Sequence, residues 1–360
     1  MPTTNTNTAY QPGVTRDDLR LILEKTPRNV WNTLRDQRIF ITGGTGFVGC
    51  WLLEALLWAN EALSLNLSLL VLSRNPNAFA VKAPHLANHK IVSLIQGDVT
   101  NLQHINNTFD IVIHAATDVV NPDSDFLTAY NAIVNGSVET LELAKRSKAT
   151  RYLLTSSGAV YGQQPASITH IPESYTGAPE THLTGSAYGQ AKRVSEWLTH
   201  CYAKKLNIDI KIARCFALIG PYLPLDAHFA VGNFIRDGVD NKTISVSGDG
   251  TAFRSYLYAA DMVIWLLTIL VNGNSNQTYN LGSEKAISIK ELAETVSDII
   301  YKCHKVNVAA EPKAGAIVQR YVPNVTKAKN ELGLEEYTDL TSSIQKTIHW
   351  EVNNRESKPN

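Results

Sequence analysis

This sequence has no excess of basic residues. Its 360 residues include 33 lysines and arginines and 33 aspartates and glutamates, so the formal net charge is zero. Proteins that bind nucleic acid or an anionic membrane surface usually carry a basic patch. We therefore expect neither kind of partner, and any attraction to phosphate must come from a few local residues.

Long apolar runs and closely spaced cysteines are also missing. The densest apolar run, residues 262–271, is far short of the roughly 20 residues that cross a bilayer. No charged segment leads into an apolar core, as a signal peptide requires, so we expect a cytoplasmic protein. The cysteines are too far apart for a zinc signature and predict buried free thiols and no metal site. They are Cys50, Cys201, Cys215 and Cys303.

What the sequence does contain is a run with separated glycines, Ile-Thr-Gly-Gly-Thr-Gly-Phe-Val-Gly, at residues 41–49. A strand-like apolar stretch precedes the run and a helix-like stretch follows it. Gly43 permits a sharp turn, Gly46 lets a pyrophosphate approach the backbone, and Gly49 lets the helix pack close to the strand. Free N–H groups at a helix start favour an anion. The run therefore predicts a dinucleotide site.

A tyrosine and a lysine stand four residues apart on a helical pattern, at Tyr188 and Lys192. This spacing places both on one helix face. A phenol with a pKa near about 10 is a poor acid or base at neutral pH, but a neighbouring ammonium and a nicotinamide charge favour the phenolate. We expect Tyr188 to shuttle a proton while a cofactor moves a hydride. Upstream, an apolar strand ends in hydroxyl residues at Ser157, and such an end points into the ligand crevice of an α/β sheet.

Apolar strand-like runs alternate with helical stretches up to about residue 220. The runs lie at 39–42, 67–72, 91–95, 110–114, 151–155 and 208–213, and the helical stretches include 132–145 and 188–205. This alternation predicts an α/β fold with a doubly wound parallel sheet of the Rossmann type. After Gly220 and Pro221 the sequence becomes rich in loops.

Together these segments resemble the extended short-chain dehydrogenase/reductase superfamily, in its NAD(P)-dependent nucleotide-sugar epimerase/dehydratase branch, from about residue 37 to about 333. Further motifs carry the resemblance: Gly97-Asp98-Val99, His114-Ala115-Ala116, Arg214-Cys215-Phe216, Gly248-Asp249-Gly250, Asp261 and Lys327-Ala328-Lys329. The resemblance implies a catalytic set of Ser157, Tyr188 and Lys192. It implies cofactor contacts at Gly43, Gly46, Phe47, Val48, Gly49, Asp98, Val99, Ala115 and Ala116, and also at Tyr188 and Lys192. It implies that Ser157, Asn233, Arg254 and Arg320 face a nucleoside-diphosphate sugar.

The resemblance also divides the chain. We expect an N-terminal tail and helical extension at 1–36 and an NAD(P)-binding Rossmann domain at 37–215, to which 255–275 returns. A smaller, discontinuous C-terminal substrate-binding lobe is expected at 216–254 and 276–345, and a C-terminal tail at 346–360. Residues 1 to about 15, rich in threonine and asparagine, predict a mobile tail. Relatives of this branch commonly pair through two helices, which implies a homodimer.

Departures from the family pattern limit the reaction. In the 4,6-dehydratases of this branch the hydroxyl residue is followed by Asp and Glu, which remove water, but here these places hold Gly158 and Ala159. Because the acid and base for elimination are lacking, we exclude dehydration as the net reaction. Ala217 and Ile133 stand where the family often has asparagine, so the identity of the sugar is left open.

The second strand also lacks the acidic residue with which an NAD site bonds the ribose 2′-hydroxyl. It ends Leu72-Ser73-Arg74. Since arginine can hold a 2′-phosphate, Ser73 and Arg74 favour NADP(H), with NAD(H) as the alternative. A reductase consumes NADPH at each turnover, so we expect a reductase of a nucleotide-linked 4-keto-6-deoxy sugar.

Three other functions stay open. A nucleotide-sugar 4-epimerase would use the same groups on a cofactor that stays bound. A non-catalytic NADP(H)-binding sensor is possible because a fold alone does not fix activity, although it needs none of Ser157, Tyr188 and Lys192. An acyl or aldehyde reductase of the superfamily would leave Arg254 and Arg320 without a diphosphate.

Overall fold

Seven parallel strands form the centre of the molecule. The computed structural model describes residues 10–117, 125–206, 208–227, 229–302, 305–313 and 315–356. The strand order is β11-β6-β5-β4-β1-β2-β3, and every neighbouring pair is parallel. The strands are β1 (Arg38–Thr42), β2 (Ser68–Ser73), β3 (Val92–Gln96), β4 (Ile111–His114), β5 (Arg151–Ser157), β6 (Asp209–Cys215) and β11 (Gln277–Leu281). The predicted Rossmann-type sheet is confirmed.

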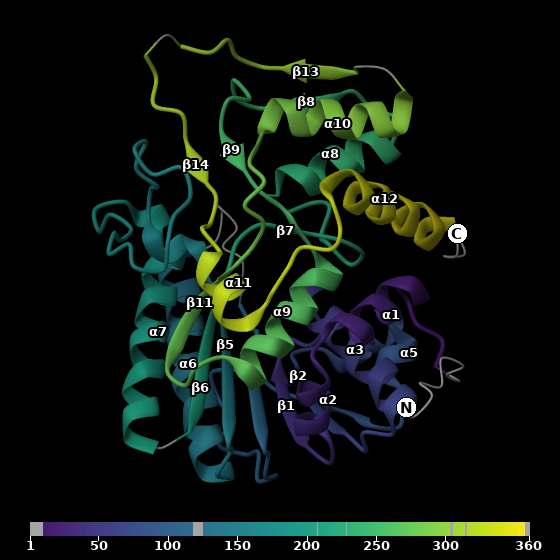
Figure 1. The fold of residues 1–360 in the computed structure, drawn as a ribbon, viewed down its shortest axis with the longest axis vertical. Helices are drawn as coiled ribbons and strands as arrows, with labels where there is room; N and C mark the ends of the chain where they lie inside the picture. The colour runs from purple at the N-terminus through teal and green to yellow at the C-terminus, as the bar shows by residue number, and fades with distance from the viewer. Residues whose placement is uncertain are drawn as a thin grey trace.

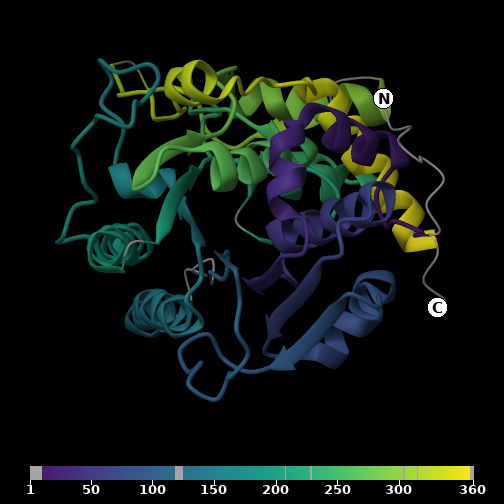
Figure 2. The same cartoon turned by 60° about the horizontal axis from the view of Figure 1, so that its bottom comes forward.

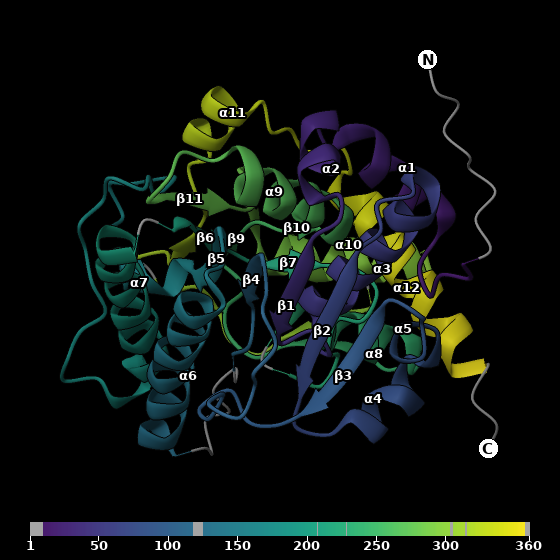
Figure 3. The same cartoon turned by 90° about the horizontal axis from the view of Figure 1, so that it is seen from below.

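The order of the strands places a crevice at the middle of the sheet. The chain passes from β1 outward to β3 and then returns to β4, which lies on the other side of β1 (Figure 3). The connections after β1 and β4 therefore leave in opposite directions. In open α/β sheets a ligand binds at such a reversal, beyond the carboxyl ends of the strands.

Helices cover both faces of the sheet (Figures 1 and 3). One face carries α6 (Phe126–Ser147) and α7 (Ala187–Leu206), which pack on each other and on β4, β5 and β6. The other carries α3 (Phe47–Leu63) and α9 (Ala259–Asn272), with α1 (Arg16–Lys25) and α2 (Arg28–Leu34) packed on them. Both α3 and α9 are buried nearly all round because they lie between two packed layers. The short helices α4 (Pro76–Lys82) and α5 (Pro84–Ala87) follow β2.

A smaller lobe stands over one end of the sheet (Figure 1). In it α8 (Ala230–Val239), α10 (Ile289–Tyr301) and α12 (Leu340–Glu356) pack around an apolar core that includes Ile235, Leu292 and Val296. A capping box of Ser288 and Glu291 begins α10. The other elements are β7 (Leu218–Ile219), β8 (Ile244–Val246), β9 (Phe253–Arg254), β10 (Leu257–Tyr258), β12 (Ile287–Ser288), β13 (Val306–Val308), β14 (Arg320–Tyr321) and α11 (Thr326–Leu332).

Two expected boundaries are wrong. The strand β11 lies within 276–345, the range assigned to the substrate lobe, but it pairs with β6 at the edge of the central sheet. Tyr279 and Leu281 of this strand are fully buried, so burial of their side chains drives the pairing. The C-terminal tail expected at 346–360 is instead α12 as far as Glu356, and Thr347 on its inner side is buried.

The N-terminal extension is more ordered than expected. Helices α1 and α2 form the helical part before the first strand, and residues 10–15 of the expected mobile tail also pack, since Tyr10 and Val14 are buried. The buried carboxylate of Asp18 holds α1 through an ion pair with Lys346 of α12 and a hydrogen bond from the Tyr258 hydroxyl at 2.9 Å. Figure 2 shows the purple N-terminal helices beside the yellow α12.

The described cysteines are free and differ in exposure. Cys50 is buried, Cys215 is half-buried and Cys201 is exposed, while Cys303 lies outside the described residues. The prediction of buried thiols is therefore wrong for Cys201, because this residue lies on the outer side of α7. Nowhere in the described ranges is a helix both long and apolar enough to span a membrane.

Asp261, in the first turn of α9, is fully buried. Its Oδ2 accepts a hydrogen bond from the backbone N of Thr338 at 3.0 Å, but burial raises the pKa of Asp261 to about 7. The folded-state pKa lies above the ordinary value of 3.8. The native protein therefore holds this proton between pH ~4 and ~7, and its stability falls as the pH rises through that window.

Asp261→Asn is expected to remove this loss because the amide stays neutral. At pH 8 we expect the variant to exceed the wild type in unfolding free energy by on the order of 1–3 kcal/mol, and by much less at pH ~4. Urea unfolding at both pH values measures the difference. An equal difference at the two pH values would mean that Asp261 does not titrate in this window.

Candidate active site

The glycine run forms the turn between β1 and α3. Gly43 has a φ of 71°, and a Cβ on it would lie 2.5 Å from the carbonyl of Ala115, so a side chain is excluded there. A Cβ on Gly49 would lie 2.3 Å from the carbonyl oxygen of Gly43. Gly46 begins α3 without a side-chain cap, so the N–H groups of the first turn are left for an anion. The turn, with Phe47 and Val48 at the helix start, fits the pyrophosphate of a dinucleotide.

The ends of β1 and β4 are linked beneath this turn. The Oγ1 of Thr42 lies 2.7 Å from the Nδ1 of His114 and accepts a hydrogen bond from the backbone N of Ala116 at 3.2 Å. Burial lowers the pKa of His114 to about 3, so its imidazole is neutral. This link places Ala115 and Ala116 against Gly43, at the point where the strand order reverses.

Ser73, Arg74 and Asp98 gather at the carboxyl ends of β2 and β3. Ser73 is buried and Arg74 is exposed. Hydrogen bonds from Thr100 lower the pKa of Asp98, and the nearby Arg74 adds to the effect. These residues therefore lie together at one edge of the sheet, and their contacts with a cofactor stay a prediction.

Val99 does not share this arrangement. A Cβ on Gly136 of α6 would lie 2.9 Å from the Cγ1 of Val99, and the half-buried Val99 packs against the apolar cluster beneath α6 and α7. Its side chain packs on α6 because it is apolar and a glycine on the helix leaves room for it. The expected contact between Val99 and a cofactor stays a prediction.

Ser157, Tyr188 and Lys192 converge at the carboxyl end of β5. Ser157 is the last residue of β5, and Tyr188 lies in the first turn of α7. The Nζ of Lys192 lies 5.9 Å from the centre of the Tyr188 ring and donates to the carbonyl oxygen of Thr155 at 3.0 Å. The Ser157 hydroxyl is close enough to affect the pKa of Tyr188. The helical spacing thus brings the phenol and the amine over the end of the strand.

Burial shifts the pKa of both ionisable groups of this centre. Burial raises the pKa of Tyr188, and hydrogen bonding to Ser157 opposes the rise. Burial also lowers the pKa of Lys192 to about 8, and the nearby Cys215 and Glu196 act against this lowering. Both shifts are toward the neutral forms, but an amine with a pKa of about 8 is still mostly protonated at pH 7. The expected phenolate form of Tyr188 stays a prediction, since it also depends on the charge of a bound nicotinamide.

A buried ion pair supports the centre from beneath. The Nη2 of Arg214 on β6 lies 2.6 Å from the Oε2 of Glu196 on α7, and Ser156 donates to the Oε1 of Glu196 at 2.6 Å. Ser156 precedes Ser157, and Glu196 lies one helical turn after Lys192. The pair therefore fixes the end of β5 relative to the helix that carries the amine.

Tyr321 on β14 brings a further hydroxyl to this centre, and no sequence motif marked it. Its Oη lies 3.4 Å from the Oγ of Ser157, and its ring packs on Phe216 with 4.6 Å between the ring centres. A Cβ on Gly158 would lie 2.8 Å from that Oη and 2.7 Å from the Phe216 ring. These rings leave no room for the carboxylate that dehydratases carry after the hydroxyl residue. Burial raises the pKa of Tyr321, so it stays a neutral donor.

The two arginines expected at the diphosphate lie on neighbouring strands but on opposite faces. The register pairs Arg320 with Phe253 and Tyr321 with Arg254, and successive side chains of a strand point to opposite faces. The guanidinium carbon of Arg254 lies 6.0 Å from the Tyr321 ring centre, whereas that of Arg320 lies 4.4 Å from the Phe253 ring centre. Arg254 therefore shares the face of Tyr321, which contacts Ser157, and Arg320 does not.

Asn233, the remaining expected sugar contact, is half-buried on α8. Its Oδ1 accepts a hydrogen bond from the Nη1 of Arg236 at 3.1 Å. This bond orients the amide along the helix. The contact between Asn233 and a sugar nucleotide stays a prediction.

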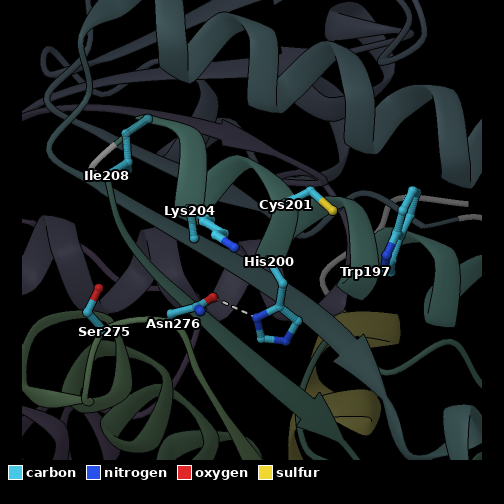
Figure 4. A pocket seen from close by; sticks show the side chains of 8 residues that line it. Trp197, His200, Cys201, Lys204, Ile208, Ser275 and Asn276 are labelled. Carbon is cyan, nitrogen blue, oxygen red and sulfur yellow. Dashed lines mark hydrogen bonds between the residues drawn. The ribbon is translucent and has the colours of Figure 1, made fainter.

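A separate hollow lies on the outer side of α7 (Figure 4). It has a volume of about 450 Å³ and is lined by Trp197, His200, Cys201 and Lys204 of α7 and by Ser275 and Asn276. The Nδ1 of His200 lies 2.6 Å from the Oδ1 of Asn276. Asn276 directly precedes β11, so the hollow lies at the amino ends of the strands. It is remote from the carboxyl ends, where Ser157 lies, and is not part of the candidate active site.

Comparison with known proteins identifies the family of this chain. The profile of the NAD dependent epimerase/dehydratase family matches residues 39–282. UDP-glucuronic acid decarboxylase 3 of Arabidopsis thaliana is 33% identical over 322 residues, which cover 86% of this chain and 87% of that protein. UDP-glucuronic acid decarboxylase 1 of Xenopus tropicalis is 29% identical over 316 residues, which cover 87% of this chain and 72% of that protein.

Solved structures share the fold. A UDP-glucose 4-epimerase from Thermotoga maritima, with UDP-glucose, gives a TM-score of 0.76 at 20% identity, covering 88% of this chain and 99% of that chain. A dTDP-glucose 4,6-dehydratase from Bacillus anthracis, in complex with NAD, gives 0.74 at 21% identity, covering 89% and 98%. These likenesses concern the fold alone, whereas the profile spans more than half of the sequence. The chain therefore belongs to the NAD dependent epimerase/dehydratase family of enzymes.

Proposed function

We propose that this enzyme transfers a hydride at C4 of a nucleoside-diphosphate sugar and that its net reaction is the reduction of a 4-keto-6-deoxy sugar. The observation that carries the proposal is the convergence of Ser157, Tyr188 and Lys192 at the carboxyl end of β5. At the next position, Gly158, aromatic rings fill the space that an eliminating carboxylate would need. Such a site suits conversion between an alcohol and a ketone.

The roles of the residues follow from their chemistry. A nicotinamide cofactor bound at the glycine turn supplies or accepts the hydride. The hydroxyls of Ser157 and Tyr188 donate hydrogen bonds to the oxygen on C4, where negative charge grows as a ketone is reduced. Tyr188 gives its proton to this oxygen, and Lys192 holds the cofactor ribose and offsets the charge left on the phenol. Arg254 binds the diphosphate through its planar fork of donors.

The edge of β2 supports the reductive direction. Ser73 and the exposed Arg74 stand where an NAD site carries an acidic residue, and a guanidinium suits the 2′-phosphate of NADP(H). NAD(H) is the second cofactor to test, because a dehydratase of the same fold is described in complex with NAD. Net reduction then consumes one NADPH for each sugar.

A nucleotide-sugar 4-epimerase is the second candidate, because a UDP-glucose 4-epimerase shares the fold over 88% of this chain. Its reaction would use Ser157, Tyr188 and Lys192 to oxidise C4 and then reduce it from the other face. The relatives include decarboxylases of UDP-glucuronic acid, so decarboxylation should also be tested. Oxidation at C4 turns a sugar with a C6 carboxylate into a β-keto acid, which loses carbon dioxide.

The stoichiometry of cofactor and product separates these reactions. Purified enzyme is mixed with NADPH or NADH and a UDP- or dTDP-linked 4-keto-6-deoxy sugar, and in parallel with UDP-glucose and with UDP-glucuronic acid. We expect one NADPH to be oxidised for each keto sugar reduced, followed by absorbance and by NMR of the product. Conversion of UDP-glucose or release of carbon dioxide without net cofactor change would overturn the reductase proposal. Cofactor binding without turnover of any of these sugars would favour the alternative of a non-catalytic NADP(H)-binding sensor.

Arg74→Ala tests the cofactor preference in the same assay. Loss of a charged contact to the 2′-phosphate is expected to raise the KM for NADPH about ten-fold and to leave the KM for NADH unchanged. Equal KM changes for the two cofactors would rule out a specific contact between Arg74 and the 2′-phosphate.

We further propose that two copies pair through α6 and α7. Trp197 on α7 is 64% exposed and Leu127 on α6 is 72% exposed, so each helix presents a large apolar side chain to solvent. We also propose a cytoplasmic location, as the sequence predicts. The pairing of two copies is a prediction from the family resemblance.

A further inference from the structure

Glu54, in the middle of α3, is a fully buried carboxylate with four partners. Its Oε2 accepts a hydrogen bond from the Tyr10 hydroxyl at 2.7 Å. Its Oε1 accepts from the Tyr222 hydroxyl at 2.7 Å and from the backbone N of Gly13 at 2.9 Å, and lies 2.8 Å from the Nε2 of His85. A buried carboxylate is costly unless its oxygens are paired. The partners are therefore held firmly on Glu54.

These partners come from distant parts of the sequence. Tyr10 and Gly13 belong to the segment 10–15 before α1, which we call the N-terminal segment. Tyr222 belongs to residues 220–226 after β7, which we call the sugar-side loop. Burial raises the pKa of Tyr10 and of Tyr222, so both phenols stay protonated and donate. Glu54 thus ties the N-terminal segment to the sugar-side loop.

Tyr222 depends on these contacts because of its backbone conformation. Its φ is 70°, in the left-handed region that bulky residues seldom adopt and that persists only where surrounding contacts enforce it. The Trp350 ring of α12 packs on Tyr222 with 4.8 Å between ring centres, and its Nε1 donates to the carbonyl oxygen of Gly13 at 2.6 Å. From α3, the Nε1 of Trp51 donates to the carbonyl oxygen of Pro221 at 2.8 Å. The loop is therefore held from both sides.

The sugar-side loop lies between the two parts of the candidate site. It leads from β7 into α8, the helix that carries Asn233. Leu223 of the loop belongs to the apolar core of the lobe, and Phe47 at the start of α3 packs against the same core. A displacement of the loop therefore moves α8 relative to the helix that begins at the glycine turn.

We infer that Glu54 is a positioning residue for the sugar nucleotide, and that the N-terminal segment sets the sugar-side loop through it. The nature of the ligand rests on the proposed function, but the tie between the two segments does not. Loosening the tie releases the loop and weakens sugar-nucleotide binding. The chemical step keeps its rate, because Ser157, Tyr188 and Lys192 are held separately by β5 and α7.

Tyr10→Phe and Tyr222→Phe test this inference in the full chain with NADPH present. Each variant removes one hydroxyl group that donates to Glu54 and keeps the aromatic ring. The control is Tyr279→Phe, which removes a buried hydroxyl that donates to Glu331 of α11 at 2.8 Å and accepts from the backbone N of Asn274 at 2.9 Å. Hydrogen–deuterium exchange of the peptide that covers 220–226 is measured together with KM and kcat for the sugar nucleotide.

We expect the exchange of residues 220–226 and the KM for the sugar nucleotide to rise about ten-fold in both variants, as for loss of one charged hydrogen bond. The kcat and the dissociation constant for NADPH should stay within about two-fold, and the control should match the wild type in the loop. Tyr10→Phe is decisive because residue 10 lies outside the loop. If it speeds exchange only in the N-terminal segment and leaves KM unchanged, the inference is wrong. Enzyme that turns over no sugar nucleotide would refute the proposed function. The exchange data would still show whether Glu54 links the N-terminal segment to the sugar-side loop.

Discussion

Tyr188→Phe is expected to lower kcat for the sugar nucleotide by about 10²- to 10⁴-fold, the range for loss of a general acid or base. The variant keeps the ring, so the packing of α7 on β5 is preserved. The dissociation constant of NADPH, measured by fluorescence, should stay within about three-fold, because Lys192 and the glycine turn are untouched. Rates of single turnover with saturating cofactor and sugar measure the effect on the chemical step.

The control for this experiment is Tyr279→Phe, a fully buried tyrosine on β11. It loses a hydroxyl outside the candidate active site and should keep the wild-type kcat. A Tyr188→Phe enzyme that retained more than about a tenth of the wild-type kcat would remove Tyr188 from the proton path. Tyr321, whose Oη is 3.4 Å from Ser157, would then be the phenol to test.

Glu196→Gln is expected to lower the free energy of unfolding by about 3–5 kcal/mol, because it leaves the guanidinium of Arg214 buried without a counter-charge. The side chains of Arg214 and Glu196 are only 14% and 7% exposed. Ser156, which donates to Glu196 at 2.6 Å, keeps only a neutral amide oxygen as its acceptor. Urea unfolding at pH 7, followed by circular dichroism, measures the loss.

A matched change on the surface separates burial from charge. Glu351→Gln breaks the pair of Glu351 with Arg355 on α12, at 2.8 Å but with Arg355 42% exposed, and should cost less than about 1 kcal/mol. The double variant Glu196→Gln with Arg214→Met should recover part of the lost stability, since it removes the unpaired charge as well. Similar losses for Glu196→Gln and Glu351→Gln would contradict the account of a buried pair.

Apolar patterning predicted the sheet well because strand burial is a local property of the sequence. Six runs of Ile, Val and Leu became β1 to β6, and the Tyr188 helix begins within a residue of its predicted start. The strand β11 was misplaced because it joins the sheet after the chain has visited the lobe. Nothing local in residues 277–281 distinguishes β6 as their partner.

Properties that depend on residues far apart in the sequence could not be predicted from local patterns. Tyr321 lies on a strand of two residues, too short for any periodic pattern, and it reaches Ser157 only through the pairing of β14 with β9. The upward shift of the Tyr188 pKa comes from burial, which isolated side-chain chemistry omits. The packing of Tyr10 depends on Glu54, 44 positions later, and so the polar composition of the first residues suggested a tail.

The position of α9 in the chain bears on how the protein is made. This helix, Ala259–Asn272, covers the same face of the sheet as α3, yet the ribosome synthesises it after β1 to β6 and after half of the lobe. Until residue 272 has emerged, the nascent sheet has an uncovered apolar side that includes Leu153. Folding of the nucleotide-binding half is therefore completed late in translation, and chaperones have a long period in which to bind this surface.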